Sequence, residues 1–165
     1  MSRFSLTVSI CLFVSGCVVF PMQTVMPLEA KIIDAHTAEE LKGIRYLRIV
    51  CDLHDYGCNK ALLEGGVLDS DIKLENKRQW GVYIAVPGGL PVPNHQIAIW
   101  KEGYSAIVFS QYDGNINDFA QSVERIDIKD AIKEIPTTRR QISPSEAREL
   151  FFNGTIKLEP IVKND

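Results

Sequence analysis

The chain has 165 residues, of which 45% are hydrophobic and 24% are charged, and its formal net charge at pH 7 is −3. This length and this apolar content suffice for one globular domain with a single core. The slight negative charge argues against nucleic acid as a partner and provides no basic patch for phospholipid headgroups.

The N-terminal segment has the parts of a secretory signal. Arg3 supplies a positive charge, residues 4–14 supply an apolar stretch, and two small residues precede Cys17. The sequence Val-Ser-Gly-Cys at residues 14–17 resembles the lipobox of bacterial lipoproteins. That resemblance implies that residues 1–16 are a cleaved signal peptide and that Cys17 carries the lipid.

Two alternatives compete with a lipid anchor: a transmembrane helix and an ordinary cleaved signal with an incidental cysteine. A spanning helix needs about 20 apolar residues, and Pro21, Gln23 and Pro27 interrupt the apolar run too early. We therefore expect attachment to the membrane through the lipid on Cys17, with residues 17–30 as the lipidated N terminus and tether. No aspartate follows the cysteine, and similarity to enterobacterial sorting then favours the outer membrane, facing the periplasm.

Two further cysteines, Cys51 and Cys58, remain after the signal segment. In an oxidising compartment such a pair is expected to form a disulfide. A redox centre or half of a zinc site fits less well, because six residues separate the thiols and no second cysteine pair exists. The sequence therefore predicts a structural disulfide and no metal site at these cysteines.

Residues 31–165 are predicted to form one domain that begins with β-strands. Apolar residues alternate with period two, most regularly from Trp80 to Val86. Gly103 is expected to turn the chain between two strands of a hairpin. The predicted strands cover residues 32–33, 44–50, 80–86, 97–101 and 106–109.

The last third has helical patterns. Asp118 is expected to cap a helix that places Phe119, Val123 and Ile126 on one side, whereas residues 127–135 fit neither period. A capping box at residues 143–146, with proline at the first helical position, predicts a helix that Gly154 ends. An edge strand is expected over residues 155–162, with Pro160 tolerated only at an edge.

Three segments resemble the transthyretin-like, carboxypeptidase-regulatory-like β-sandwich. The pattern D-A-x-T-G-x-P-I-x-G is kept at Asp34, Ala35, Thr37 and Gly43, and this favours a turn rather than a helix after Asp34. Residues 82–87 resemble the strand that ends in V-P, and residues 97–104, which end in Lys-Glu-Gly-Tyr, resemble the K-x-G-Y hairpin. The resemblance implies a mainly β, transthyretin-like antiparallel sandwich with one or two C-terminal helices, in a family whose domains mostly support neighbours or bind partners.

Few residues are candidates for chemistry. His54 lies between the two cysteines beside Asp52 and Asp55, where a metal or acid–base site is conceivable and a polar loop held by the disulfide is the preferred interpretation. His95 follows a proline-rich turn and is expected to be exposed. No nucleophile elbow, phosphate loop, zinc-protease motif or dinucleotide fingerprint is present, so we predict no catalytic residue, no cofactor and no enzyme activity.

Aromatic residues gather around the predicted hairpin, where they either bind a partner or fill the core. The leading functional hypothesis is a non-enzymatic, membrane-anchored lipoprotein of the cell envelope that binds or positions another envelope protein. The alternatives are a lipoprotein subunit of a secretion apparatus and a metal-binding or enzymatic protein that uses the His54 loop. The possible partner-binding residues are Trp100, Tyr104, Phe109 and Tyr112.

Overall fold

The structure is a computed structural model that describes residues 23–24, 28–51, 57–74, 78–79, 95–110 and 115–162. The chain divides into two units. In the smaller unit, β1 (Gln23–Thr24) pairs antiparallel with β6 (Arg78–Gln79). The other strands and helices of the described residues belong to the larger unit, although the sequence predicts a single domain over residues 31–165.

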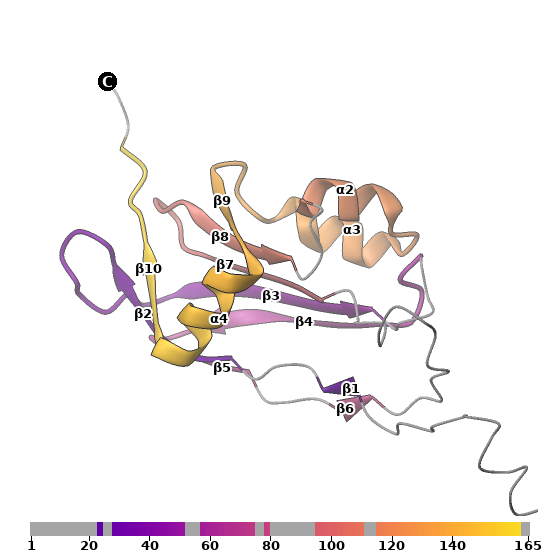
Figure 1. Cartoon of the computed structure of the whole chain (residues 1–165). Coiled ribbons are helices and arrows are strands. Elements are labelled where there is room, and N and C mark those ends of the chain that lie inside the picture. The colour runs from indigo at the N-terminus through magenta and orange to yellow at the C-terminus, as the bar shows by residue number, and fades with distance from the viewer. Residues whose placement is uncertain are drawn as a thin grey trace, which may run out of the picture. The chain divides into compact units, whose positions relative to one another are not determined.

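A five-stranded sheet forms the centre of the larger unit (Figure 1). Its strands lie in the order β4-β3-β7-β8-β9, and β3 and β4 pair antiparallel without interruption from Ile44↔Leu68 to Cys51↔Ala61. β7 and β8 form the predicted antiparallel hairpin, with Gly103 in the turn at a φ of +83°. The strands are β3 (Ile44–Cys51), β4 (Ala61–Leu68), β7 (His95–Trp100), β8 (Ala106–Ser110) and β9 (Arg139–Ile142).

A three-stranded sheet with the order β10-β2-β5 contains β2 (Leu28–Asp34), β5 (Asp71–Leu74) and β10 (Thr155–Leu158). Every second side chain of β2 is buried, as period-two alternation requires. Two sheets and short helices near the C terminus confirm the predicted fold class, a mainly β sandwich. β2 begins at Leu28, before the tether boundary that the sequence predicts at residue 30.

Two strand pairs are parallel, whereas the sequence predicts an antiparallel sandwich. β9 pairs parallel with β8, and β10 pairs parallel with β2. Parallel neighbours need a long crossover connection, and the helices α2 (Ile116–Ser122) and α3 (Ile126–Lys133) lie in the connection from β8 to β9. The helical segment of the last third therefore explains why β9 departs from the antiparallel pattern.

Buried apolar residues form one cluster on each face of the five-stranded sheet. The first joins this sheet to the smaller sheet and to α4 (Pro144–Asn153). The second lies between the sheet and the pair α2 and α3, which Figure 1 shows side by side. Residues of the first cluster include Ile32, Ile44, Ile72, Ile97, Phe109 and Ile156; those of the second include Leu47, Ile49, Trp100, Phe119, Ile128 and Ile132.

The first predicted helix begins earlier than expected. Asn115, not Asp118, is the N-cap of α2, and its side chain accepts hydrogen bonds from the amides of Asn117 (2.8 Å) and Asp118 (3.1 Å). Phe119 is buried as expected, but Ile126 starts α3 and is 74% exposed. The segment that fits neither period in the sequence is thus mostly helix α3.

Helix α4 confirms the predicted helix start and end, and Ser143 caps it as predicted, while the Glu146 carboxylate pairs with Arg140. The Ser143 hydroxyl accepts a hydrogen bond from the Glu146 amide (3.2 Å), proline occupies the first turn, and Gly154 ends the helix in the left-handed region at a φ of +63°. β10 follows as an edge strand of the smaller sheet, and Pro160 lies just beyond it. These local signals are strong because each acts on the helix end itself: Ser143 accepts from a free amide, proline lacks an amide that would be unpaired there, and glycine adopts the left-handed conformation without strain.

Several predictions fall on residues outside the described ranges: the lipobox segment, the strand over 80–86, the His54 loop and Tyr112. In the described part of the chain, no helix combines the length and the apolar character needed to cross a membrane.

Candidate functional site

Two motif segments of the family resemblance meet in the structure. The Tyr104 hydroxyl, from the β7–β8 hairpin, donates to the Asp34 carboxylate at the end of β2 over 2.8 Å. The other oxygen of Asp34 accepts from the amides of His36 (2.7 Å) and Thr37 (2.9 Å), which confirms the predicted turn. The Thr37 amide, the Tyr104 hydroxyl and the His36 amide together lower the pKa of Asp34. Tyr104 therefore connects the two sheets of the sandwich.

Tyr104→Phe removes this connection and is expected to lower the melting temperature by several degrees, because the Asp34 carboxylate loses a charge-assisted hydrogen bond. Thermal unfolding followed by circular dichroism measures the effect. Tyr46→Phe is the matched control, since no hydrogen bond of the Tyr46 hydroxyl is found among the described residues. Equal melting temperatures for Tyr104→Phe and the wild type would contradict the role given to Tyr104.

The predicted aromatic cluster is not one surface. Trp100 and Phe109 are both buried, and they lie on opposite faces of the five-stranded sheet, in different apolar clusters. Tyr104 is half-buried against the first cluster. The structure therefore places these three residues in or against the core, and Trp100 also borders an open groove. The sequence could not distinguish partner binding from core packing, because aromatic residues are common in both.

The expectation that His95 is exposed is wrong. His95 is the first residue of β7, pairs in register with Val50, and is only 3% exposed. Its ring meets the ring of Phe109 edge-on, with 6.2 Å between centroids. Burial, together with the positive charge of Arg48, lowers the pKa of His95 to about 4. Among the described residues, its Nε2 atom has no hydrogen-bond partner.

A charged pair lies inside the sandwich near His95. Arg48 of β3 is fully buried, and its Nε and Nη2 atoms lie 3.0 and 2.7 Å from the Glu64 carboxylate of β4. The two residues are directly opposite in the strand register. The Glu64 side chain is partly exposed, so the pair reaches from the interior toward the edge of the sheet.

An open groove of about 440 Å³ runs beside β4 on the face that carries α3. Arg45 lies over the Trp100 ring, 5.5 Å from its centroid, and its Nη2 atom bonds to the carboxylate of Glu134, the C-cap residue of α3, over 2.6 Å. Val67 is 66% exposed at the border of the groove. The remaining lining comes largely from Leu47, Leu63, Gly65, Gly66 and Ala131.

The groove combines a cation stacked on an aromatic ring with an apolar floor, a composition typical of binding surfaces. Gly65 deepens it, because its position opposite Leu47 faces α3 and carries no side chain, whereas the neighbouring Gly66 faces the other side of the sheet beside Tyr46. Within the described ranges, no three His, Cys, Asp or Glu residues lie close enough to hold a metal ion. The groove is the candidate functional site, and the sequence does not reveal it because it depends on the register between β3, β4 and β7 and on where α3 packs.

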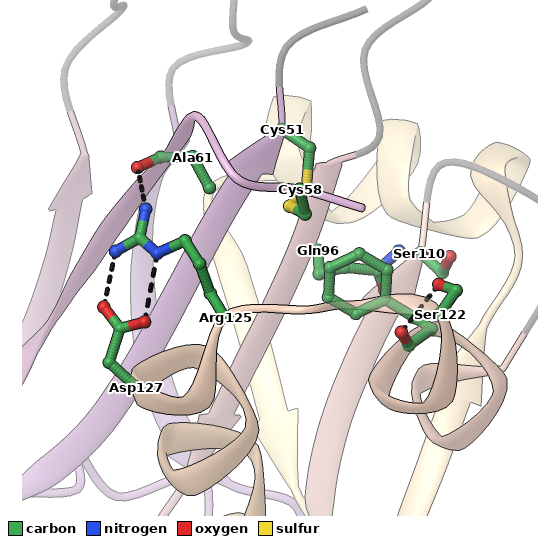
Figure 2. The surroundings of a disulfide bond; sticks show 9 residues. Cys51, Cys58, Ala61, Gln96, Ser110, Ser122, Arg125 and Asp127 are labelled. Carbon is green, nitrogen blue, oxygen red and sulfur yellow. Dashed lines mark hydrogen bonds and ion pairs between the residues drawn. A yellow bond between two sulfur atoms is a disulfide. The ribbon is translucent and has the colours of Figure 1, made fainter. Parts of the chain in front are cut away.

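The predicted disulfide is confirmed. Cys51, at the end of β3, is bonded to Cys58, with Cα atoms 5.0 Å apart and both residues buried. Figure 2 shows the bond above the segment that connects α2 to α3, where Arg125 donates to the Ala61 carbonyl over 2.8 Å. The Glu124 amide donates to the Gly57 carbonyl over 2.8 Å. The disulfide thus joins the end of β3 to the residues before β4, and the two hydrogen bonds hold Gly57 and Ala61 next to the connection between α2 and α3.

The double variant Cys51→Ala/Cys58→Ala is expected to lose about 2–3 kcal/mol of unfolding free energy, because the open loop regains its entropy in the unfolded chain. Urea unfolding of the oxidised wild type and of the variant measures this difference. Treating the variant with a reductant is the control and should change nothing further. A variant as stable as the oxidised wild type would contradict a stabilising role for the disulfide.

Comparison with protein-family models, with curated proteins and with solved structures gave no match. The transthyretin-like resemblance therefore stays a prediction beyond the fold class.

Proposed function

We propose that the protein is a non-enzymatic lipoprotein of the bacterial cell envelope that is anchored through a lipid on Cys17 and binds another envelope protein. The observation that carries the proposal is the sequence Val-Ser-Gly-Cys at residues 14–17, placed after a positive charge and an apolar stretch. A multiply acylated cysteine supplies the two hydrophobic attachments that stable anchoring needs. The cysteine is followed by no aspartate, which favours the outer membrane with the folded part facing the periplasm.

The disulfide supports the proposed compartment. Disulfides persist in oxidising environments such as the periplasm and are rare where thiols are kept reduced. Cys51 and Cys58 are bonded and buried in the sandwich. The bond and the lipobox pattern are independent features of the chain, and both are compatible with export.

The groove beside β4 supports a binding role. Trp100, Arg45 and Glu134 line it, and aromatic residues and arginine are enriched at the energetic centres of protein interfaces. The exposed Val67 at its border adds apolar area that a partner would cover. We assign partner binding to this groove rather than to the four aromatic residues as a group.

Crosslinking in cells, followed by capture of the full, tagged chain from solubilised membranes, tests the binding role. Glu134→Arg removes the ion pair with Arg45 and places two positive charges side by side, so the yield of crosslinked envelope partner should fall several-fold. Asp130→Arg is the matched control, because Asp130 is an exposed carboxylate on the same helix that does not line the groove. Recovery of the chain alone under every condition, or equal loss in both variants, would contradict the proposal.

A further inference from the structure

The two edges of the five-stranded sheet differ. β9 is an edge of four residues that begins with Arg139 and Arg140, and short or charged edges resist pairing with other chains. β4 is an edge of eight residues with a continuous register to β3, and among the described residues no strand pairs with its outer side. Long, regular edges are templates for strand addition.

The β4 edge lacks the usual protective features. Residues 61–68 contain no proline, no lysine and no bulge, and their one charge, Glu64, is engaged by the buried Arg48. Val67 is exposed, and Gly65 and Gly66 expose backbone in the middle of the strand. The Arg125 guanidinium bonds to the Ala61 carbonyl and so covers the first residue of the strand. The segment of β4 that has no described strand partner on its outer side is therefore residues 62–68, and Gly65 is its centre.

The open segment is self-complementary about Gly65. In an antiparallel pair, directly opposite residues lie on the same face of the sheet, whereas neighbouring residues of one strand lie on opposite faces. When a strand pairs with its own copy, the two-fold axis must therefore pass beside a residue and not between two residues. Centring on Gly65 places leucine opposite leucine, leucine opposite valine, and a carboxylate opposite glycine. Centring on Glu64 instead would place two carboxylates opposite each other, which is unfavourable. The opposed pairs are Leu62 with Leu68, Leu63 with Val67, and Glu64 with Gly66.

We infer that β4 pairs antiparallel with β4 of a second copy of this chain, about a two-fold axis at Gly65. The contact is the symmetric kind that closed dimers use, and it extends the sheet of one copy into that of the other. Leu63 and Val67 also border the groove, so the grooves of the two copies meet at the axis. This inference goes beyond the proposed function and does not depend on the lipid anchor.

A charge on the edge tests the dimer. Val67→Lys should raise the dimer dissociation constant by at least about tenfold, because an edge lysine would have to be desolvated opposite Leu63. Ile126→Lys is the matched control, since Ile126 is also a strongly exposed apolar residue but lies on α3. Native mass spectrometry of the full, detergent-solubilised chain should find two copies for the wild type and for Ile126→Lys, and one copy for Val67→Lys. Circular dichroism verifies that both variants are folded.

Paired cysteines test the register. Residues 63 and 67 of opposite copies should face each other with Cβ atoms about 4.5–5.5 Å apart, so Leu63→Cys/Val67→Cys should form an intermolecular disulfide under mild oxidation. Neither single variant should form this disulfide, because a cysteine and the same cysteine of the other copy would be four positions, or about 13 Å, apart along the strands.

Three results would overturn the inference. The first is a wild-type protein that is monomeric at every concentration. This result would mean that a segment of its own chain or a different protein covers β4. The second is a dimer that Val67→Lys leaves intact. The third is equal crosslinking of the single and double cysteine variants. None of these results alters the capture experiment with Glu134→Arg, so failure of the dimer and failure of the proposed function are distinguishable.

Discussion

Lowering the pH from 7 to 4 is expected to reduce the free energy of unfolding through His95 by on the order of 3 kcal/mol. The ordinary pKa of 6.5 applies to the unfolded chain, and burial in the sandwich together with the charge of Arg48 lowers the pKa in the folded chain to about 4. Between these two values the unfolded chain binds a proton that the folded chain does not. The stability is therefore unaffected above pH 6.5 and is lost progressively as the pH falls toward 4.

Urea unfolding at several pH values between 7 and 4 measures this dependence. His95→Gln keeps a neutral polar side chain at every pH, so its stability should vary less over the same range. Carboxylates such as Asp34, whose pKa is lowered in the folded chain, also weaken the fold at acidic pH. They do so equally in both proteins, and the difference between the two curves isolates His95. Parallel curves for the wild type and His95→Gln would contradict a buried, neutral histidine.

Glu64→Ala is expected to cost about 3–5 kcal/mol, because it removes a carboxylate that pairs with the fully buried Arg48 guanidinium. The double variant Arg48→Met/Glu64→Leu removes both charges and should regain most of that loss, since apolar side chains of similar volume replace a buried pair at little cost. Urea unfolding of the two variants at pH 7 measures both values.

The exposed ion pair between Arg45 and Glu134 is the matched control. Both side chains are more than half exposed, so Glu134→Ala should cost no more than about 1 kcal/mol. If Glu64→Ala were as mild as Glu134→Ala, or if the double variant were less stable than Glu64→Ala, Arg48 would not be a buried charge that depends on Glu64.

The sequence predicts those strands whose apolar residues alternate or run continuously. β3, β7 and β8 are found in this way, as are the hairpin turn at Gly103 and the start and end of α4. β4 is missed because Gly65 and Gly66 interrupt its apolar pattern; it forms a strand because it pairs with β3 along its whole length. β9 is missed because its arginines resemble a loop, whereas parallel pairing with β8 makes it a strand. Such strands depend on tertiary pairing rather than on local pattern.

The candidate groove is less predictable because it depends on register: Arg45 and Trp100 become neighbours only through the antiparallel pairing of β3 with β7. Other contacts inside the sandwich depend on register in the same way. Arg48 and Glu64 lie 16 positions apart, and only the antiparallel pairing of β3 with β4 places them opposite each other. The same applies to His95, which the preceding prolines suggest to be exposed and which the start of β7 turns into the interior. Cys51 and Cys58 could be paired from the sequence, because the predicted export signal and the count of cysteines leave few alternatives.

The proposed lipid anchor is tested most directly by the intact mass of the protein, measured on the membrane fraction of cells that express the full chain. We expect a chain that begins at Cys17 and carries the added mass of its acyl groups. We also expect the Cys17→Ala variant to be absent from the membrane fraction. A wild type without acyl mass, together with a Cys17→Ala variant that still fractionates with membranes, would contradict the proposed lipid anchor.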